Sequence, residues 1–127
     1  MKKDNLNMEI CIIDDSHTMR LITSKVCKLI LPGIPIQTFA SVDEALDYFN
    51  ENDSKRRILF VDLEMPEKTG WDFLNVYQPR PKDVVYILSS SDKESQMHKA
   101  KKYPFVSDFL IKPLTAQTFR AIASTQL

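Results

Sequence analysis

The sequence predicts an α/β fold: a three-layer sandwich in which helices cover both faces of a five-stranded parallel sheet. Five short apolar runs alternate with segments of helical spacing, which is the pattern that parallel strands and their crossover helices produce. The first, third and fourth runs are almost continuously apolar rather than alternating, as is typical of strands buried on both faces. The runs are residues 10–13, 36–39, 58–61, 84–88 and 109–111.

Five helices are predicted between and after these strands. Apolar residues recur at intervals of three and four over residues 18–31, and Pro32-Gly33 ends that helix. Ser41 and Glu44 form a capping-box pattern at the start of the second helix. The remaining helices are predicted over residues 70–77, over residues 92–103, and after Thr115.

Length, composition and charge exclude several classes of protein. Lys plus Arg and Asp plus Glu number 17 each, so the formal net charge is zero, whereas a general nucleic-acid binder carries a basic excess. No apolar run approaches the roughly 20 residues of a membrane span, and the polar leader over residues 1–8 lacks the apolar stretch of a signal peptide. Cys11 and Cys27 lie in apolar segments and are predicted to be free, buried thiols. We expect one cytoplasmic domain over residues 1–127 that binds neither membranes nor nucleic acid directly.

Polar side chains follow four of the five predicted strands, at the point where each strand ends. Asp14 and Asp15 follow the first strand and Asp62 follows the third. Ser89 follows the fourth strand and Lys112 follows the fifth. Taken singly, each is an ordinary turn or cap residue. Because the carboxyl ends of parallel strands meet at one edge of a sheet, the whole set is expected to share one site there.

The chemistry of this predicted site favours a metal ion and a phosphoryl group. Two carboxylates about 5 Å apart repel each other by roughly 3 kcal/mol at an effective dielectric near 20, so a cluster of them raises its pKa values or recruits a cation. Mg²⁺ prefers oxygen ligands and shares its coordination shell with phosphoryl groups. Lys112 supplies a positive charge and Ser89 a hydroxyl donor. An aspartate can also act as a nucleophile toward phosphorus.

With these residues in place, the sequence resembles the receiver domain of two-component response regulators, of the single-domain chemotaxis-regulator type. The resemblance extends from about residue 9 to residue 126. It implies a flavodoxin-like sheet with strand order 2-1-3-4-5 and five helices. The motifs that carry it are Ile12-Ile13-Asp14-Asp15-Ser16, Val61-Asp62-Leu63-Glu64-Met65-Pro66, Gly70, Ser89-Ser90 and Lys112-Pro113.

The resemblance implies a role for each acidic residue and for the lysine. Asp62 would be the phosphoacceptor, and Lys112 would pair first with its carboxylate and then with the phosphoryl oxygens. Asp15, Asp62 and the backbone carbonyl of Glu64 would hold Mg²⁺, and Asp14 would help to bind it.

The resemblance also implies a conformational switch. Ser89 would move toward the phosphoryl group, and Phe109 would occupy the aromatic switch position. The output surface would then lie on the fourth helix, fifth strand and fifth helix. The peptide bond between Lys112 and Pro113 is expected to be cis, as is usual in the family. The bulky segment 103–106 stands where the family usually has a small Gly-Ala pair, which is a departure beside Phe109.

The implied function is that of a phosphorelay receiver. The protein would accept a phosphoryl group from a histidine kinase or histidine phosphotransfer protein and switch a surface that binds a downstream protein target. It would not be an enzyme beyond catalysing its own phosphorylation and dephosphorylation. The start at Met1 and the polar leader favour a stand-alone regulator.

Three other functions compete with this interpretation. A flavodoxin-like cofactor binder needs a hydroxyl- and glycine-rich phosphate cradle after the first strand, where Asp14 and Asp15 would repel phosphate. An aspartyl phosphatase typically carries its Asp-x-Asp pair after the first strand, whereas Asp62-Leu63-Glu64 follows the third. A receiver-like interaction module that is not phosphorylated remains open as the alternative.

Overall fold

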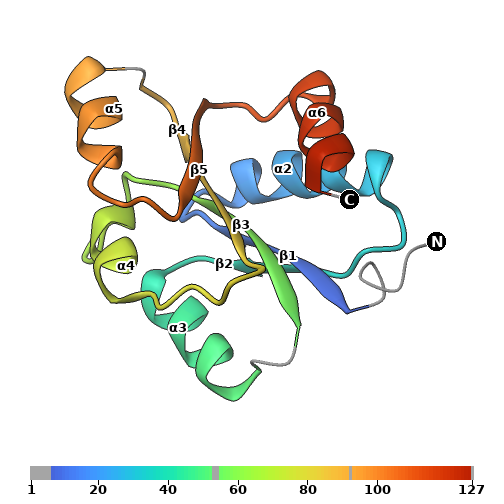
Figure 1. The fold of residues 1–127 in the computed structure, drawn as a ribbon, viewed down its shortest axis with the longest axis horizontal. Helices are drawn as coiled ribbons and strands as arrows, with labels where there is room; N and C mark the ends of the chain where they lie inside the picture. Colours follow the sequence, from blue (N-terminus) through green and yellow to red (C-terminus); the bar gives the residue numbers. More distant parts are fainter. Residues whose placement is uncertain (1–6, 53–54, 92, 127) are drawn as a thin grey trace.

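The computed structural model describes residues 7–52, 55–91 and 93–126, which form an α/β sandwich around one parallel sheet (Figure 1). The sheet has five strands in the order β2-β1-β3-β4-β5, and all neighbouring strands are parallel. This confirms the predicted fold class and strand order. The strands are β1 (Met8–Ile13), β2 (Ile36–Phe39), β3 (Arg56–Val61), β4 (Val84–Ser89) and β5 (Val106–Ile111).

Five helices connect and follow the strands, and they cover both faces of the sheet. They are α2 (His17–Ile30), α3 (Val42–Glu51), α4 (Gly70–Val76), α5 (Glu94–Ala100) and α6 (Ala116–Gln126). Helices α2 and α6 contribute buried residues to one hydrophobic core, while α3, α4 and α5 contribute to the other. Within the described part of the chain, no helix has both the length and the apolar character that crossing a membrane requires.

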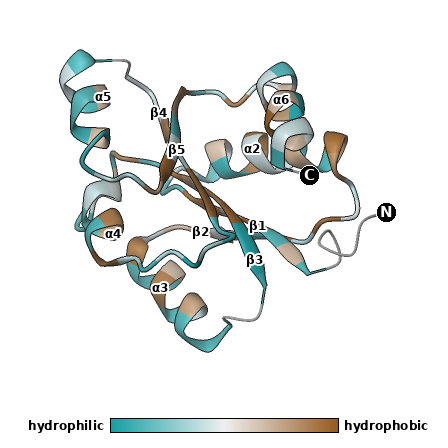
Figure 2. Cartoon of the chain, viewed as in Figure 1, coloured by the Kyte–Doolittle hydropathy of each residue, from teal (hydrophilic) through white to brown (hydrophobic). Residues whose placement is uncertain are grey.

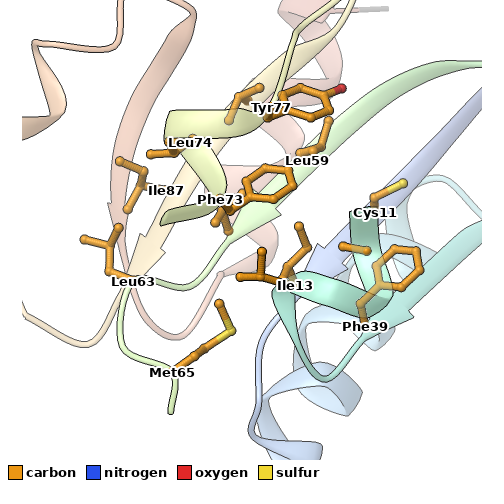
Figure 3. Close-up of a cluster of buried hydrophobic side chains, with 14 of the residues drawn as sticks. Cys11, Ile13, Phe39, Leu59, Leu63, Met65, Phe73, Leu74, Tyr77 and Ile87 are labelled. Carbon is orange, nitrogen blue, oxygen red and sulfur yellow. The ribbon is translucent and has the colours of Figure 1, made fainter. Parts of the chain in front are cut away.

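The two cores arise because successive strand residues point to opposite faces of the sheet. In β1, Ile10 and Ile12 face the core under α2 and α6, whereas Cys11 and Ile13 face the core under α3 and α4. Figure 3 shows the second core, where Phe73 and Leu74 of α4 lie against strand side chains. Figure 2 shows that the central strands are mostly hydrophobic, as the nearly continuous apolar runs predict.

Serine side chains cap the first two helices, and the structure confirms the cap predicted at Ser41. The Ser16 hydroxyl accepts a hydrogen bond from the Met19 N–H (3.2 Å), which starts α2 at His17, one residue before the predicted start. The Ser41 hydroxyl accepts from the Glu44 N–H (3.2 Å) at the start of α3. These side chains satisfy backbone donors that the first helical turn leaves without partners.

The strands and helices differ from the prediction mainly at their ends. Strand β1 already includes Met8, the last residue of the predicted leader, while residues 1–6 lie outside the described part. Strand β5 begins at Val106, three residues before the predicted apolar run. Because β5 lies at the edge of the sheet, Ser107 and Asp108 are exposed, so the apolar pattern does not mark the first half of the strand. Helix α5 covers only Glu94–Ala100 of the predicted 92–103, and a turn follows it before Pro104.

Cys11 and Cys27 are buried and free, as predicted, and burial raises the pKa of both thiols. Thr23, like Cys27, is a buried residue of α2. It is 0% exposed, and its hydroxyl has no hydrogen-bond partner among the described residues. A buried hydroxyl without a partner loses its hydrogen bonds to water and gains none in return.

We therefore predict that Thr23→Val raises the free energy of unfolding by about 1–2 kcal/mol, because valine keeps the shape and removes the unpaired hydroxyl. Urea denaturation monitored by circular dichroism measures the change. Thr23→Ser is the matched control: it keeps the hydroxyl, removes a buried methyl group and lowers stability by about 1 kcal/mol. A valine variant less stable than the parent protein contradicts the prediction.

Candidate functional site

The predicted site residues lie at the carboxyl edge of the sheet, where the loops after four strands meet. Asp14 and Asp15 follow β1, and Asp62 follows β3. The Asp62 N–H donates to the Ile13 carbonyl (2.9 Å), so the β1 and β3 ends are fixed to each other. The Lys112 N–H donates to the Ser89 carbonyl (2.7 Å), which fixes the ends of β5 and β4 in the same way.

Three carboxylates meet at this edge. Asp14, Asp15 and Asp62 each offer an oxygen, and these oxygens lie within 4.8 Å of one another. Asp14 and Asp62 are only 2% and 3% exposed, whereas Asp15 is exposed, so the cluster opens to solvent on the Asp15 side. An all-oxygen donor set with two buried carboxylates and one accessible one suits Mg²⁺, which keeps several of its waters. The donors present therefore fit the predicted metal.

Lys112 lies between the two buried carboxylates. Its Nζ is 2.7 Å from Asp14 Oδ2 and 3.1 Å from Asp62 Oδ1. Buried ionised carboxylates need such a partner, because burial without compensation is strongly unfavourable. One ammonium does not balance three carboxylates, so the cluster retains negative charge when all three are ionised. That excess favours the binding of a cation.

Burial and the neighbouring charges shift the pKa values of Asp62 and Lys112. Burial and then the charge of Asp14 raise the pKa of Asp62 to about 6, although Lys112 and the Glu64 N–H act in the opposite direction. Burial lowers the pKa of Lys112, but the hydrogen bond to Asp14 and the charge of Asp62 outweigh burial and raise it overall. At neutral pH, Asp62 is therefore mostly ionised and Lys112 is charged.

Hydrogen bonds from nearby backbone N–H groups orient the carboxylates. Asp14 Oδ1 accepts from the Ser16 N–H (2.9 Å), and Asp62 Oδ1 accepts from the Glu64 N–H (3.2 Å). The Arg20 guanidinium donates to the Asp14 backbone carbonyl (2.7 Å) and holds the loop from the helix side. The sequence analysis did not predict a role for Arg20. The signal that could have indicated one is an arginine in the helix that follows the Asp14-Asp15 pair. The carbonyl of Glu64 as a metal ligand stays a prediction.

Gly70 fits closely against the backbone of Asp62. A Cβ atom at Gly70 would lie 2.3 Å from the Asp62 carbonyl oxygen and 2.9 Å from the Leu63 Cα. The Gly70 N–H also donates to the Leu63 carbonyl (3.1 Å). Glycine is required here because no side chain fits between the start of α4 and the loop that carries Asp62.

Ser89 and Phe109 lie on the neighbouring strands β4 and β5. Ser89 is fully buried, and its hydroxyl accepts from the Ser91 N–H (3.2 Å). Phe109 is half-buried and lies opposite Ile87, where it packs against the core under α3 and α4. The peptide bond before Pro113 is cis, as predicted. The switching roles of Ser89 and Phe109 stay predictions.

The bulky segment before β5 forms an aromatic contact with α4. The rings of Tyr103 and Trp71 stack with their centroids 5.8 Å apart, and Phe105 meets the Tyr103 ring edge-on. The Tyr103 hydroxyl donates to Asn75 Oδ1 (2.6 Å). Large side chains replace the small pair that the resemblance leads one to expect, and they connect α4 to the segment that enters β5.

Comparisons with known proteins agree with this geometry. The sequence profile of the response regulator receiver domain matches residues 10–124. The chain is similar to the cyclic di-GMP phosphodiesterase response regulator RpfG of Xanthomonas campestris pv. campestris (strain 8004), with 27% identity over 99% of this chain. It spans only 33% of the length of that relative.

Two solved structures have the same fold. One is a two-component response regulator from Cytophaga hutchinsonii, with a TM-score of 0.84, 24% identity, and coverage of 94% of this chain and 96% of that one. The other is a response regulator receiver domain protein from Clostridium thermocellum, with a TM-score of 0.73, 28% identity, and coverage of 94% and 93%.

We predict that Gly70→Ala lowers the free energy of unfolding by about 1–3 kcal/mol, because the added methyl group displaces the Asp62 loop. Gly33→Ala is the matched control, since nothing lies within 4 Å of a Cβ at that position. Urea denaturation of both variants measures the difference. Equal stabilities for the two variants would mean that the Gly70 contact does not constrain the loop.

Proposed function

Because the response regulator receiver profile covers residues 10–124, the chain belongs to that family, and we propose that it is the phosphoacceptor of a two-component phosphorelay. The observation that supports this most directly is the position of Lys112 between Asp14 and Asp62. That arrangement places a nearly buried carboxylate beside a positive charge and within the cluster of three acidic side chains. Asp62 is the proposed acceptor.

The proposed reaction transfers a phosphoryl group from a phosphohistidine to Asp62. A carboxylate oxygen attacks phosphorus, the new O–P bond forms, and the P–N bond breaks. The histidine nitrogen keeps the electron pair of that bond, and the imidazole returns to its neutral form by taking up a proton. Asp62 Oδ1 already contacts Lys112 and the Glu64 N–H, so we infer that Oδ2, which has no recorded hydrogen bond among the described residues, is the attacking oxygen.

Mg²⁺ would be held by the carboxylates of Asp14, Asp15 and Asp62 and by the backbone carbonyl of Glu64. When bound, the ion supplies positive charge that offsets the repulsion between these carboxylates and the incoming phosphoryl oxygens. Lys112 remains within reach of the same oxygens, because its Nζ already contacts Asp62 Oδ1. Mg²⁺ would bind this donor set only when the carboxylates are ionised.

A downstream protein would detect phosphorylation by binding to the changed surface of the receiver. A phosphoryl group at Asp62 attracts the Ser89 hydroxyl through a charge-assisted hydrogen bond, and Phe109 responds on the neighbouring strand. The donor would be a cytoplasmic histidine kinase or histidine phosphotransfer protein, and the receiver of the signal a downstream protein target. The protein would act on no further substrate. A buried acid at Asp14 argues against a phosphate-bearing cofactor at the same edge.

We predict that acetyl phosphate with Mg²⁺ adds one phosphoryl group to the protein and that Asp62→Asn abolishes the addition, because the amide is a far weaker nucleophile. Intact-mass spectrometry measures the adduct. Asp47→Asn is the control, since Asp47 is an exposed acid on α3 that does not belong to the cluster of Asp14, Asp15 and Asp62.

Two outcomes would count against the proposed function. If no donor modifies the parent protein, the chain is a receiver-like interaction module that is not phosphorylated. If the adduct persists in Asp62→Asn, the acceptor is a different residue.

A further prediction concerns Mg²⁺. Excess Mg²⁺ should raise the midpoint of thermal unfolding, because an ion that binds only the folded state stabilises it. Asp15→Asn removes an exposed charged ligand, so it should increase the Mg²⁺ concentration needed for the same shift by about tenfold or more. Glu51→Gln at the other end of α3 is the control and should leave the Mg²⁺ dependence unchanged. A normal Mg²⁺ response from Asp15→Asn would exclude Asp15 as a ligand.

A further inference from the structure

A groove runs between helices α3 and α4, which lie side by side on one face of the sheet (Figure 1). Two adjoining hollows form it, with volumes of about 400 and 460 Å³. Leu46 of α3 and Val76 of α4 line both hollows, so the two are continuous. Lys68 and Asp72 border the first hollow, and the second reaches Arg57 at the start of β3.

The floor of the groove is apolar. Val76 is 57% exposed at the end of α4, and Leu46 is partly buried against the core. Phe49 lines the second hollow, and its ring packs against the rings of Phe73 and Tyr77. An apolar side chain exposed beside such a hollow is available to a partner rather than to the core of this chain.

The helices that form the walls are acidic. Helix α3 carries four acidic residues and α4 carries one, and neither contains a lysine or an arginine. Lys68 supplies an ammonium at the first hollow, and its Nζ lies 2.6 Å from Asp43 Oδ1. The hydrogen bond and charge of Asp43, and then the charges of Asp72 and Asp47, raise the pKa of Lys68. Three carboxylates near one ammonium leave negative charge for a partner.

The arginines at the second hollow do not cancel this charge. Arg57 is 3% exposed, and its guanidinium donates to the Asn52 carbonyl and to the Tyr77 hydroxyl (3.4 Å). Arg80 Nη2 lies 3.3 Å from Asp83 Oδ1. Because both guanidiniums already have partners within the chain, the charge available along the groove is that of the carboxylates on α3 and α4.

We propose that this surface, which we call the α3–α4 groove (Leu46, Lys68, Asp72, Asn75 and Val76), binds a basic protein segment that inserts a large apolar side chain between the two helices. The apolar anchor covers Leu46 and Val76, and the lysines or arginines beside it complement Asp72 and the acidic residues of α3. The proposal goes beyond the phosphorelay role, because binding here needs neither Mg²⁺ nor a phosphoryl group.

Other classes of ligand satisfy only one feature of the groove. A polyamine or a metal ion pairs with the carboxylates and leaves the apolar floor uncovered. A nucleic acid or an anionic membrane surface is repelled by the acidic walls. A basic amphipathic helix satisfies both features, because its apolar residues recur every three or four positions and its charged residues flank them.

The test uses three synthetic helical peptides. The probe is built from Lys and Ala and carries two Leu residues four positions apart; one control peptide replaces Leu by Ser, and the other replaces Lys by Glu. Binding to the full chain without Mg²⁺ or phosphodonor is followed by ¹H–¹⁵N NMR. We expect the probe to shift the amide signals of Leu46, Asp72 and Val76 and to bind at least tenfold more tightly than either control peptide or spermine.

Two variants should weaken the interaction. Asp43→Lys/Asp47→Lys and Val76→Ser should each lower the affinity for the probe about tenfold. Glu94→Lys/Asp108→Lys makes the same change in net charge as the first variant, at exposed sites on α5 and β5, and it should bind the probe nearly as well as the parent protein.

A third variant should strengthen the interaction. Lys68→Gln removes the ammonium that competes with the lysines of the probe for the carboxylates of the groove, so it should raise the affinity about threefold. A variant that merely disturbs the fold does not gain affinity, so this result separates a binding role from a structural one.

Several results would overturn the proposal: probe-induced shifts centred on the acidic cluster or elsewhere, an equal loss of affinity in both charge-reversed variants, weaker binding to Lys68→Gln, or binding of spermine as tight as that of the probe. Sedimentation velocity tests a second copy of the chain as the occupant, and self-association that Val76→Ser abolishes would also contradict the proposal. Because the assay contains no phosphodonor, its failure is separate from a failure of Asp62 to accept a phosphoryl group.

Discussion

The ion pairs of Lys112 with Asp14 and Asp62 are the constraint on which the carboxyl edge of the sheet depends. The lysine follows β5, and its ammonium reaches carboxylates that follow β1 and β3, with distances of 2.7 and 3.1 Å. Two nearly buried carboxylates side by side are tolerated only with such a charge between them. One lysine cannot neutralise three carboxylates, and Asp15 forms no ion pair with Lys112, so the cluster keeps a net negative charge. One arrangement thus compensates the two buried carboxylates and leaves an excess of negative charge in the cluster.

Much of the fold follows from local patterns, but the starts of the central strands do not. Glu9 and Arg57 extend β1 and β3 beyond the apolar runs, and the two residues lie opposite each other in the parallel register. Both are almost fully buried, where the Tyr48 hydroxyl donates to Glu9 Oε1 (2.7 Å). A charged residue is read as exposed when only its sequence neighbours are known. Its burial depends on a partner in another strand, which a local pattern does not contain.

The site was more predictable than the strand ends, for a topological reason. In a parallel sheet the residues that follow the strands all lie at the same edge, and those that follow adjacent strands are neighbours there. The sequence did not predict the contacts that hold the loops of the site in place. The contact of Arg20 with the Asp14 carbonyl and the stacking of Trp71 on Tyr103 depend on where helices come to lie. For Gly70 the sequence indicated the residue, and the structure supplies the reason: the Asp62 carbonyl occupies the space of a side chain.

Strand β5 connects Phe109 to the acidic cluster. Phe109, three residues before Lys112, packs against the core under α3 and α4, while Lys112 contacts the two buried carboxylates. On the proposed function, phosphorylation changes the charge that Lys112 faces, at the end of the strand that carries Phe109. A partner that contacts the Phe109 ring favours one position of that ring only to the extent that it binds the two positions with different affinity. By the same linkage, a target that prefers the phosphorylated form must also favour phosphorylation of Asp62.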